Sequence, residues 1–292
     1  MRKKEMDPEP LRNCKGRFPF KLATTSYIYP DQIIPNVGKI GPYLDEIELV
    51  LFESKREDDL PDEGEISALI NLSSRLDVGF NIHLPIDIYL GDENEGVRSK
   101  GVSIVKEVFG RTLRLNPSVY TLHLDLKNPP VPPFIKGGRR GDFPKGSTGR
   151  SVREEDLGGW RVRLLRSMEE ILECGIETRR ISIETLGYPF EWIEDIVRKF
   201  DFSICLDVGH LLVNGLDLPL YFRKYLSDTS IIHLHGVENG TDHLGVDKLE
   251  NGIIDRILSQ LQHYRGIVSI EVFSFDDLKR SLEVLEEKWG KR

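Results

Sequence analysis

Histidine is concentrated in a few short apolar segments of this chain. Six of the seven histidines lie in or just after strand-like runs, and most are within a few positions of a carboxylate or of another histidine. Imidazole and carboxylate groups are the ligands that zinc and similar cations use in proteins. The pattern therefore predicts a metal site. The segments are Asn81–Pro85, Leu122–Asp125, Asp207–His210, His233–Gly236 and Asp242–His243.

Two more strand-like segments end in a carboxylate, at Glu184 and at Glu271. A carboxylate has two oxygens, so Glu184 can bridge two cations. Two cations about 3.5–4 Å apart can activate water and stabilise both oxygens of an in-line displacement. We therefore expect Glu184 and Glu271 to serve catalysis as well as metal binding. A mixed set of imidazoles and carboxylates suits zinc, manganese, iron or cobalt, and ligand type does not choose among them.

Strand-like and helix-like segments alternate along the whole chain. Eight strands alternating with helices predict an α/β fold, a (β/α)8 barrel with residues 1–292 in one domain. The competing open sheet lacks its usual Gly-x-Gly-x-x-Gly turn after the first strand. The predicted strands are Lys21–Thr25, Ile47–Glu53, Phe80–Leu84, Val119–Leu124, Arg180–Glu184, Ser203–Asp207, Ile231–His235 and Ile267–Val272. The predicted helices are Glu65–Leu76, a stripe from Trp160 to Leu172, Phe190–Phe200, Gly252–Leu261 and Asp276–Trp289.

Functional groups of such barrels project from the carboxyl ends of the strands. One candidate ligand lies at or near the end of each of strands three to eight. The six candidates are His83, His123, Glu184, Asp207, His235 and Glu271.

Three further histidines belong to the same region. His233 and His235 are two residues apart and point to one face of a strand. We favour His235 as the ligand and His233 as a substrate contact or an orienting group. His210 follows Asp207 past Gly209 and is expected slightly farther out, where Asp242 and His243 could close an outer site.

Strands one and two end in polar groups that are weaker candidates for site residues. Thr25, Ser26 and Tyr27 end strand one and are candidates for substrate contact. Glu53 ends strand two and is either a general base, a carboxylate that orients a ligand, or a solvated rim residue.

The bulk composition limits the partners. A net charge of −8 argues against nucleic acid as a binding partner, because nucleic-acid-binding proteins present a positively charged surface. Three cysteines without paired spacing and no long apolar run predict a cytoplasmic protein without a membrane helix.

Residues 1–19 read as an N-terminal extension. Residues 129–150 hold five Pro, five Gly and five basic residues, which predicts a mobile insertion after strand four, either a tolerated insertion or a phosphate-binding lid.

Over about Phe20 to Trp289 the ligand pattern resembles the xylose isomerase-like barrel superfamily, which includes AP endonucleases of the endonuclease IV type. Those endonucleases hold three metals. The resemblance implies one site at His83, His123 and Glu184, and a second at Glu184, Asp207, His235 and Glu271. It implies a third at His210, Asp242 and His243. That family spaces the last pair as Asp-x-His, whereas Asp242 and His243 are adjacent here, so two cations are expected, or three if this outer set also binds one.

Longer motifs are similar to a narrower family, the cobamide-remodelling phosphodiesterases (CbiR). The motifs are Thr24–Ile28 with Asn36-Val37, Val50–Ser54, His83–Asp87, Glu184–Phe190, Cys205–His210 and Ile232–Val237. This resemblance implies a small-molecule corrinoid substrate. The enzyme would hydrolyse the phosphodiester of the nucleotide loop and release cobinamide phosphate and the α-riboside of the lower ligand.

Two other enzymatic activities compete with this interpretation. A sugar or sugar-phosphate isomerase or epimerase would need mainly Glu184, Asp207, His235 and Glu271 around one cation. An AP endonuclease would need a basic groove and wedge residues for a flipped nucleotide. A barrel that binds a corrinoid without turnover is a fourth possibility, which the full ligand set argues against.

Overall fold

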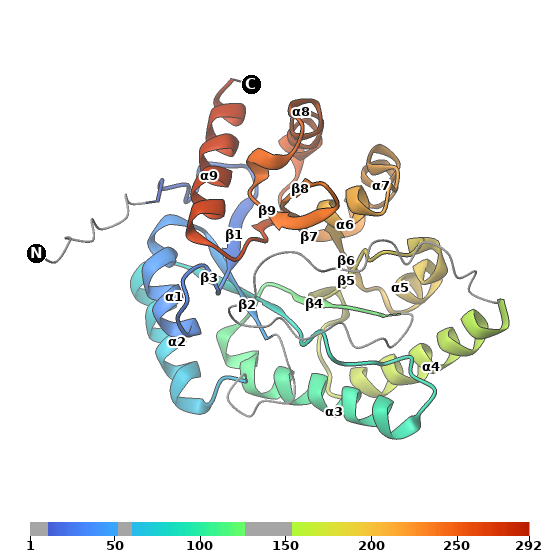
Figure 1. Cartoon of the computed structure of the whole chain (residues 1–292). Helices are drawn as coiled ribbons and strands as arrows, with labels where there is room; N and C mark the ends of the chain where they lie inside the picture. Colours follow the sequence, from blue (N-terminus) through green and yellow to red (C-terminus); the bar gives the residue numbers. More distant parts are fainter. Residues whose placement is uncertain (1–10, 52–59, 126–153, 292) are drawn as a thin grey trace, which may run out of the picture.

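Eight parallel strands close into a barrel in the part of the chain that the computed structural model describes, residues 11–51, 60–125 and 154–291. Helices form a ring around these strands (Figure 1). The predicted (β/α)8 barrel is therefore confirmed. Around the barrel the order is β1 (Lys21–Thr25), β10 (Ile267–Ile270), β7 (Thr229–Leu234), β6 (Ser203–Asp207), β5 (Ile181–Glu184), β4 (Tyr120–Leu122), β3 (Gly79–His83) and β2 (Glu46–Val50).

The sequence located every barrel strand, although several bounds differ. The first and sixth strands have the predicted limits, whereas β4 is three residues shorter than the predicted Val119–Leu124 and β2 ends at Val50 instead of Glu53. Glu53, the insertion at 129–150 and residues 1–10 lie outside the described residues, so those expectations stay predictions.

The helices of the outer ring bury their apolar faces against the strands. Burial on both faces explains why strands such as β2 and β6 contain no exposed position. The sequence missed α1, α3, α6 and α7. The helices are α1 (Ile33–Ile40), α2 (Glu63–Leu76), α3 (Glu95–Thr112), α4 (Glu154–Leu172), α5 (Glu194–Phe200), α6 (Val208–Val213), α7 (Leu218–Tyr225), α8 (Asn251–Gln260) and α9 (Phe275–Gly290).

Strand β2 shows how the barrel separates an apolar outside from a polar inside. Ile47 and Leu49 belong to the main core between strands and helices, where each buried side chain contributes about 1.5–3 kcal/mol. Glu46 and Glu48 alternate with them and are equally buried. Their carboxylates bond to side chains of other barrel strands, so they lie inside the barrel.

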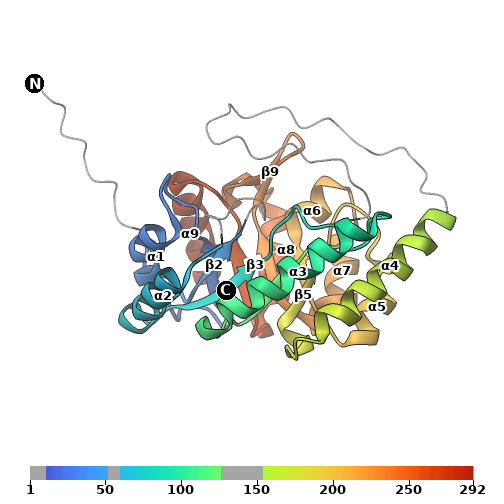
Figure 2. The ribbon, with the colours of Figure 1, turned by 90° about the horizontal axis from the view of Figure 1, so that it is seen from below.

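A hairpin that the sequence did not predict follows β7. Strands β8 (Gly236–Glu238) and β9 (Thr241–Leu244) pair antiparallel. Asn239 and Gly240 make the turn with positive φ angles of 56° and 76°, as a tight hairpin requires. The hairpin projects beyond the ring of helices (Figure 2). No helix among the described residues is long and apolar enough to cross a bilayer.

Candidate metal centre

The six predicted strand-end ligands come together at one end of the barrel. His83, Glu184 and Asp207 are the last residues of β3, β5 and β6. His123, His235 and Glu271 each follow the last residue of β4, β7 and β10. Because all the strands are parallel, these side chains meet at the carboxyl end of the barrel.

Glu184 is the centre of the first group. Its Oε2 lies 3.2 Å from Nε2 of His83 and 2.9 Å from Nε2 of His123. Its Oε1 lies 3.2 Å from Nδ1 of His210. The two oxygens of one buried carboxylate thus face imidazoles on two sides.

Asp207 and His210 are positioned by the abrupt start of α6. The Asp207 carboxylate caps this helix, and its Oδ1 accepts the backbone N–H of His210 at 2.7 Å. The first turn brings the His210 ring back over the strand, with Nδ1 3.4 Å from Asp207 Oδ2. His235 completes this side, with Nε2 3.2 Å from Asp207 Oδ1.

The β8–β9 hairpin adds His243 to the mouth. Its ring stacks on that of His235, with centroids 4.3 Å apart and planes 9° from parallel. Its Nε2 lies 3.5 Å from Glu271 Oε2, and its Nδ1 lies 3.0 Å from Asp242 Oδ1. The adjacent Asp242 therefore contacts the imidazole of His243 in this conformation.

His233 lies within β7 and is fully buried. Its Nε2 lies 3.0 Å from Oε1 of Glu48, and its Nδ1 lies 3.2 Å from Oε2 of Glu271. Glu48 is a site residue that sequence reasoning missed. The available signal was a carboxylate placed inside an otherwise apolar strand, where burial requires a partner.

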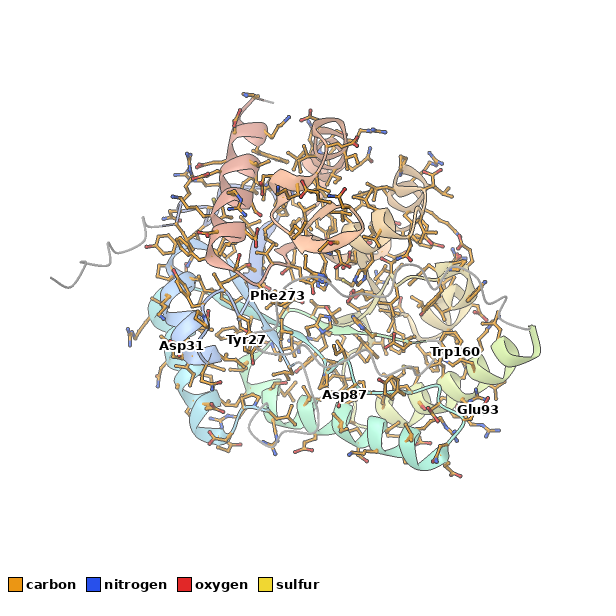
Figure 3. The ribbon with its side chains drawn as sticks, viewed as in Figure 1. Tyr27, Asp31, Asp87, Glu93, Trp160 and Phe273 are labelled. Atoms are coloured by element: carbon orange, nitrogen blue, oxygen red, sulfur yellow. The ribbon has the colours of Figure 1, made fainter. Side chains whose placement is uncertain are left out.

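Two of the candidate residues at the end of strand one form hydrogen bonds with the backbone of neighbouring segments. The Thr25 hydroxyl donates to the Val272 carbonyl at 2.6 Å, and the Ser26 hydroxyl accepts the Val50 N–H at 3.2 Å. Tyr27 is half-buried and lies nearer the barrel axis than Asp31 (Figure 3). Substrate contact by these three residues and by His233 stays a prediction.

Opposite charges hold the cluster ionised in the absence of a cation. Burial lowers the pKa of His210, but the negative charges of Asp207 and Glu184 outweigh it and raise the pKa to about 9. Burial also lowers the pKa values of His83, His233 and His243, but neighbouring acidic groups raise all three. These groups are Glu184 for His83, Cys205 and then Glu48 for His233, and Glu271 for His243. Burial raises the pKa values of Glu184 and Glu271, but the imidazoles outweigh it and hold both well below the usual range.

The donor atoms fit divalent cations. Two ligands of a tetrahedral cation at about 2.0–2.1 Å are about 3.3 Å apart, which is close to the separations above. Three buried atoms, Nδ1 of His210, Nδ1 of His233 and Oε2 of Glu271, have no hydrogen-bond partner among the described residues. Buried polar atoms are rarely left unpaired, so these three atoms fit a site that holds a cation. Three of the sets that could hold an ion are His83/His123/Glu184, Glu184/Asp207/His210 and His210/His235/His243.

Fold and site together define a parallel eight-stranded barrel with imidazole and carboxylate donors at its carboxyl end. The chain belongs to the xylose isomerase-like TIM barrel family, which matches residues 39–288. The superfamily resemblance drawn from the ligand pattern is thereby confirmed. A search of curated proteins found no match.

Several solved structures share the fold. A D-tagatose 3-epimerase-like protein is 21% identical with a TM-score of 0.70, over 93% of this chain and 98% of that one. Endonuclease IV from Thermus thermophilus is 15% identical with a TM-score of 0.61, over 93% and 100%. An IolI protein with a binding zinc atom is 13% identical with a TM-score of 0.64, over 93% and 97%. At these identities the likeness concerns the fold alone.

Proposed function

We propose that this protein is a metal-dependent phosphodiesterase that hydrolyses the nucleotide-loop phosphodiester of cobamides. The observation that carries the hydrolytic assignment is the arrangement around Glu184. Its Oε2 faces His83 and His123, while its Oε1 faces His210. A carboxylate shared in this way suits a pair of cations, which is the arrangement used by many phosphoester hydrolases.

The imidazole and carboxylate side chains would hold the cations in separate sets. His83, His123 and Glu184 would hold one cation, and Glu184, Asp207, His235 and Glu271 a second. His210, Asp242 and His243 are the donors nearest a third. Bound zinc, manganese, iron or cobalt would supply Lewis acidity that polarises the phosphate ester and activates water.

The reaction needs one water molecule and no other reactant. The water oxygen forms a bond to phosphorus, and the bond from phosphorus to the ribose oxygen breaks. A proton from water ends on the released riboside, and cobinamide phosphate is the other product. The buried carboxylates Glu184 and Glu271 would supply the negative charge that holds cations beside the phosphate.

The corrinoid substrate is supported by sequence motifs that extend past the ligands. Thr24–Ile28, Glu184–Phe190 and Cys205–His210 resemble the cobamide-remodelling phosphodiesterases. Several of these residues, such as Thr24, Thr185 and Leu206, are buried.

The test is a product assay on metal-reconstituted protein. Purified protein is stripped with a chelator, reloaded with each of the four metals and incubated with adenosylcobalamin. Mass spectrometry should detect cobinamide phosphate and the α-riboside. His123→Ala should abolish both products, whereas His263→Ala, at an exposed histidine outside the site, should leave them unchanged. Intact corrinoid with every metal would refute the proposal.

Sugar epimerisation is the second candidate, because the structures that share the fold include a D-tagatose 3-epimerase-like protein. Such a reaction would use Glu184, Asp207, His235 and Glu271 around one cation, with the carboxylates moving a proton. One bound cation per chain and conversion of a ketohexose would favour it. Cleavage of an abasic duplex would instead favour the endonuclease activity that the net charge of −8 argues against.

A further inference from the structure

We infer that Asn81, Thr121 and Ser182 form a binding site for ordered water inside the barrel, one layer of side chains below the candidate metal centre. All three side chains are fully buried. Asn81 Oδ1, Thr121 Oγ1 and Ser182 Oγ each lack a hydrogen-bond partner among residues 11–51, 60–125 and 154–291. Buried hydroxyl and amide groups are rarely left unpaired, and buried water is a common partner for them. The site does not depend on the proposed reaction.

The three residues lie directly below candidate ligands on three neighbouring strands. Each comes two positions before the ligand of its own strand, that is, before His83, His123 and Glu184. Side chains two positions apart on a strand point to the same face. The three side chains therefore point into the barrel, about 6.6 Å from the ligands toward the amino-terminal ends of the strands.

The tilt of the strands brings the three side chains together. His83 pairs in register with Thr121, and Thr121 pairs with Ser182. His83 nevertheless contacts Glu184, two residues beyond Ser182, at 3.2 Å. Residues at one level on β3 and β5 are thus offset by two positions in register, as the tilt of strands in a closed barrel requires. The same offset places Asn81 level with Ser182, with Thr121 on the strand between them.

The amide of Asn81 presents its oxygen to this site. Its Nδ2 donates to Oε2 of Glu46 at 3.2 Å, and a carboxylate can only accept from it. Oδ1 is therefore left as an acceptor. The hydroxyls of Thr121 and Ser182 can each donate or accept. One acceptor and two hydroxyls match a buried water, which makes about three hydrogen bonds.

Water fits this site better than a second type of cation. The three oxygens are neutral, so they carry no charge to offset that of a buried ion. The imidazoles and carboxylates of the metal centre differ from them in this respect. The separation in chemistry assigns cations to the upper layer of donors and water to the lower one.

Small side chains leave room for this water. Barrel interiors are usually filled by bulky branched residues such as Val, Ile and Leu, whereas Asn, Thr and Ser occupy the three inward positions here. Val119 comes two residues before Thr121 and belongs to a separate buried apolar cluster that includes Ile231 and Ile267. This cluster closes the site toward the amino-terminal ends of the strands, so the water should exchange slowly with bulk solvent.

Thr112 provides a matched control. It is also buried, but its hydroxyl has partners within the protein. The hydroxyl donates to the Val108 carbonyl at 2.6 Å and lies 3.1 Å from the Tyr120 hydroxyl. Thr112→Val therefore measures the cost of losing a paired buried hydroxyl in this protein, without disturbing internal water.

The experiment counts internal water in the full-length protein, with equal metal content in every variant. Oxygen-17 magnetic relaxation dispersion counts water molecules that stay bound for longer than the tumbling time of the protein, and urea unfolding gives the unfolding equilibrium constant. Thr121→Val and Ser182→Ala should each lose at least one long-lived water and raise the unfolding constant about fivefold. Thr112→Val should raise this constant by a similar factor and keep the wild-type water count.

A dry site would give the opposite results. A wild-type water count in both Thr121→Val and Ser182→Ala would overturn the inference. An unfolding constant that Thr121→Val leaves unchanged or lowers would also overturn it, because exchanging an unpaired buried hydroxyl for a methyl group is neutral or stabilising. If Thr121→Val does not fold, a high-resolution crystal structure of the wild type decides. Density for water within hydrogen-bonding distance of Thr121 Oγ1 and Ser182 Oγ supports the site, and a dry interior there overturns it.

Discussion

Gly209→Ala should disable the metal centre through a single methyl group. A Cβ built on Gly209 would lie 1.8 Å from Cε1, 2.3 Å from Nδ1 and 2.4 Å from Nε2 of His235. Carbon atoms in contact are about 3.5–4.0 Å apart, so the ring must move by roughly 1.7 Å. The opposite face of the ring stacks on His243 with centroids 4.3 Å apart, which blocks retreat in that direction.

The expected loss follows from this displacement. A misplacement of about 1 Å in a catalytic site can cost about 10²-fold in rate, so kcat/KM on cobamide should fall about 100-fold or more. Overpacking costs about 1–3 kcal/mol of the free energy of unfolding. Gly209 lies in α6 and does not have a positive φ, so alanine itself introduces no backbone strain.

The assay compares Gly209→Ala with Gly110→Ala. Gly110 lies in α3 with nothing within 4 Å of an added Cβ. Alanine there should raise the free energy of unfolding by about 0.5–1 kcal/mol and leave catalysis intact. Bound metal, melting temperature and kcat/KM are measured for both proteins. Wild-type metal content and activity in Gly209→Ala would refute the placement of His235 against Gly209 as a functional constraint.

Three further predictions concern charge, protons and helix capping. Glu184→Gln removes the charge shared by the imidazoles around it, and should lower cation affinity more than about tenfold, measured by metal titration. Burial lowers the pKa of His210 but Asp207 raises it to about 9. A cation must displace that proton, so affinity should rise with pH up to about 9, with proton release in calorimetry; pH-independent binding would contradict this. Asp62→Ala breaks a capping box with Glu65 at the start of α2, and should cost about 1 kcal/mol in urea unfolding without changing turnover.

The meeting of the strand-end candidates could be predicted because two simple rules determine their position. Strands buried on both faces read as apolar runs, and a parallel barrel gathers the residues that follow those runs. His83, His123, Glu184, Asp207 and Glu271 therefore lie together as expected. Small errors in strand limits did not matter, because a ligand one residue beyond a strand still reaches the mouth.

Glu48 could not be predicted from the strand-end rule, because it lies inside its strand. The sequence directed attention to Glu53 on strand two, which lies outside the described residues. The carboxylate that contacts the cluster is five residues earlier, inside the strand. A glutamate at every second position of an apolar strand indicates an inward polar layer, and Glu46 and Glu48 form that pattern.

Other misses came from local signals that were overlooked or weak. Asn239-Gly240 is a standard hairpin turn, and it places His243 on a strand, β9. Helix α3 contains Gly96, Gly101 and Gly110, which lower helix propensity. Packing in the main core, through residues such as Val105 and Phe109, stabilises this helix despite its glycines.

Charge balance gives an independent argument on the number of cations. Among the described residues, five carboxylates have an oxygen within 3.2 Å of an imidazole nitrogen: Glu48, Glu184, Asp207, Asp242 and Glu271. With neutral imidazoles, a single divalent cation would leave three negative charges uncompensated in a largely buried site. Two cations would leave one. Uncompensated buried charge is costly, so the metal-free protein balances the carboxylates with protonated imidazoles, and cation binding must replace those protons. An epimerase with one cation would need imidazolium ions to persist beside it, whereas a two-cation hydrolase would not. Counting the protons released per chain at saturating cation therefore distinguishes the two functions before any substrate is added.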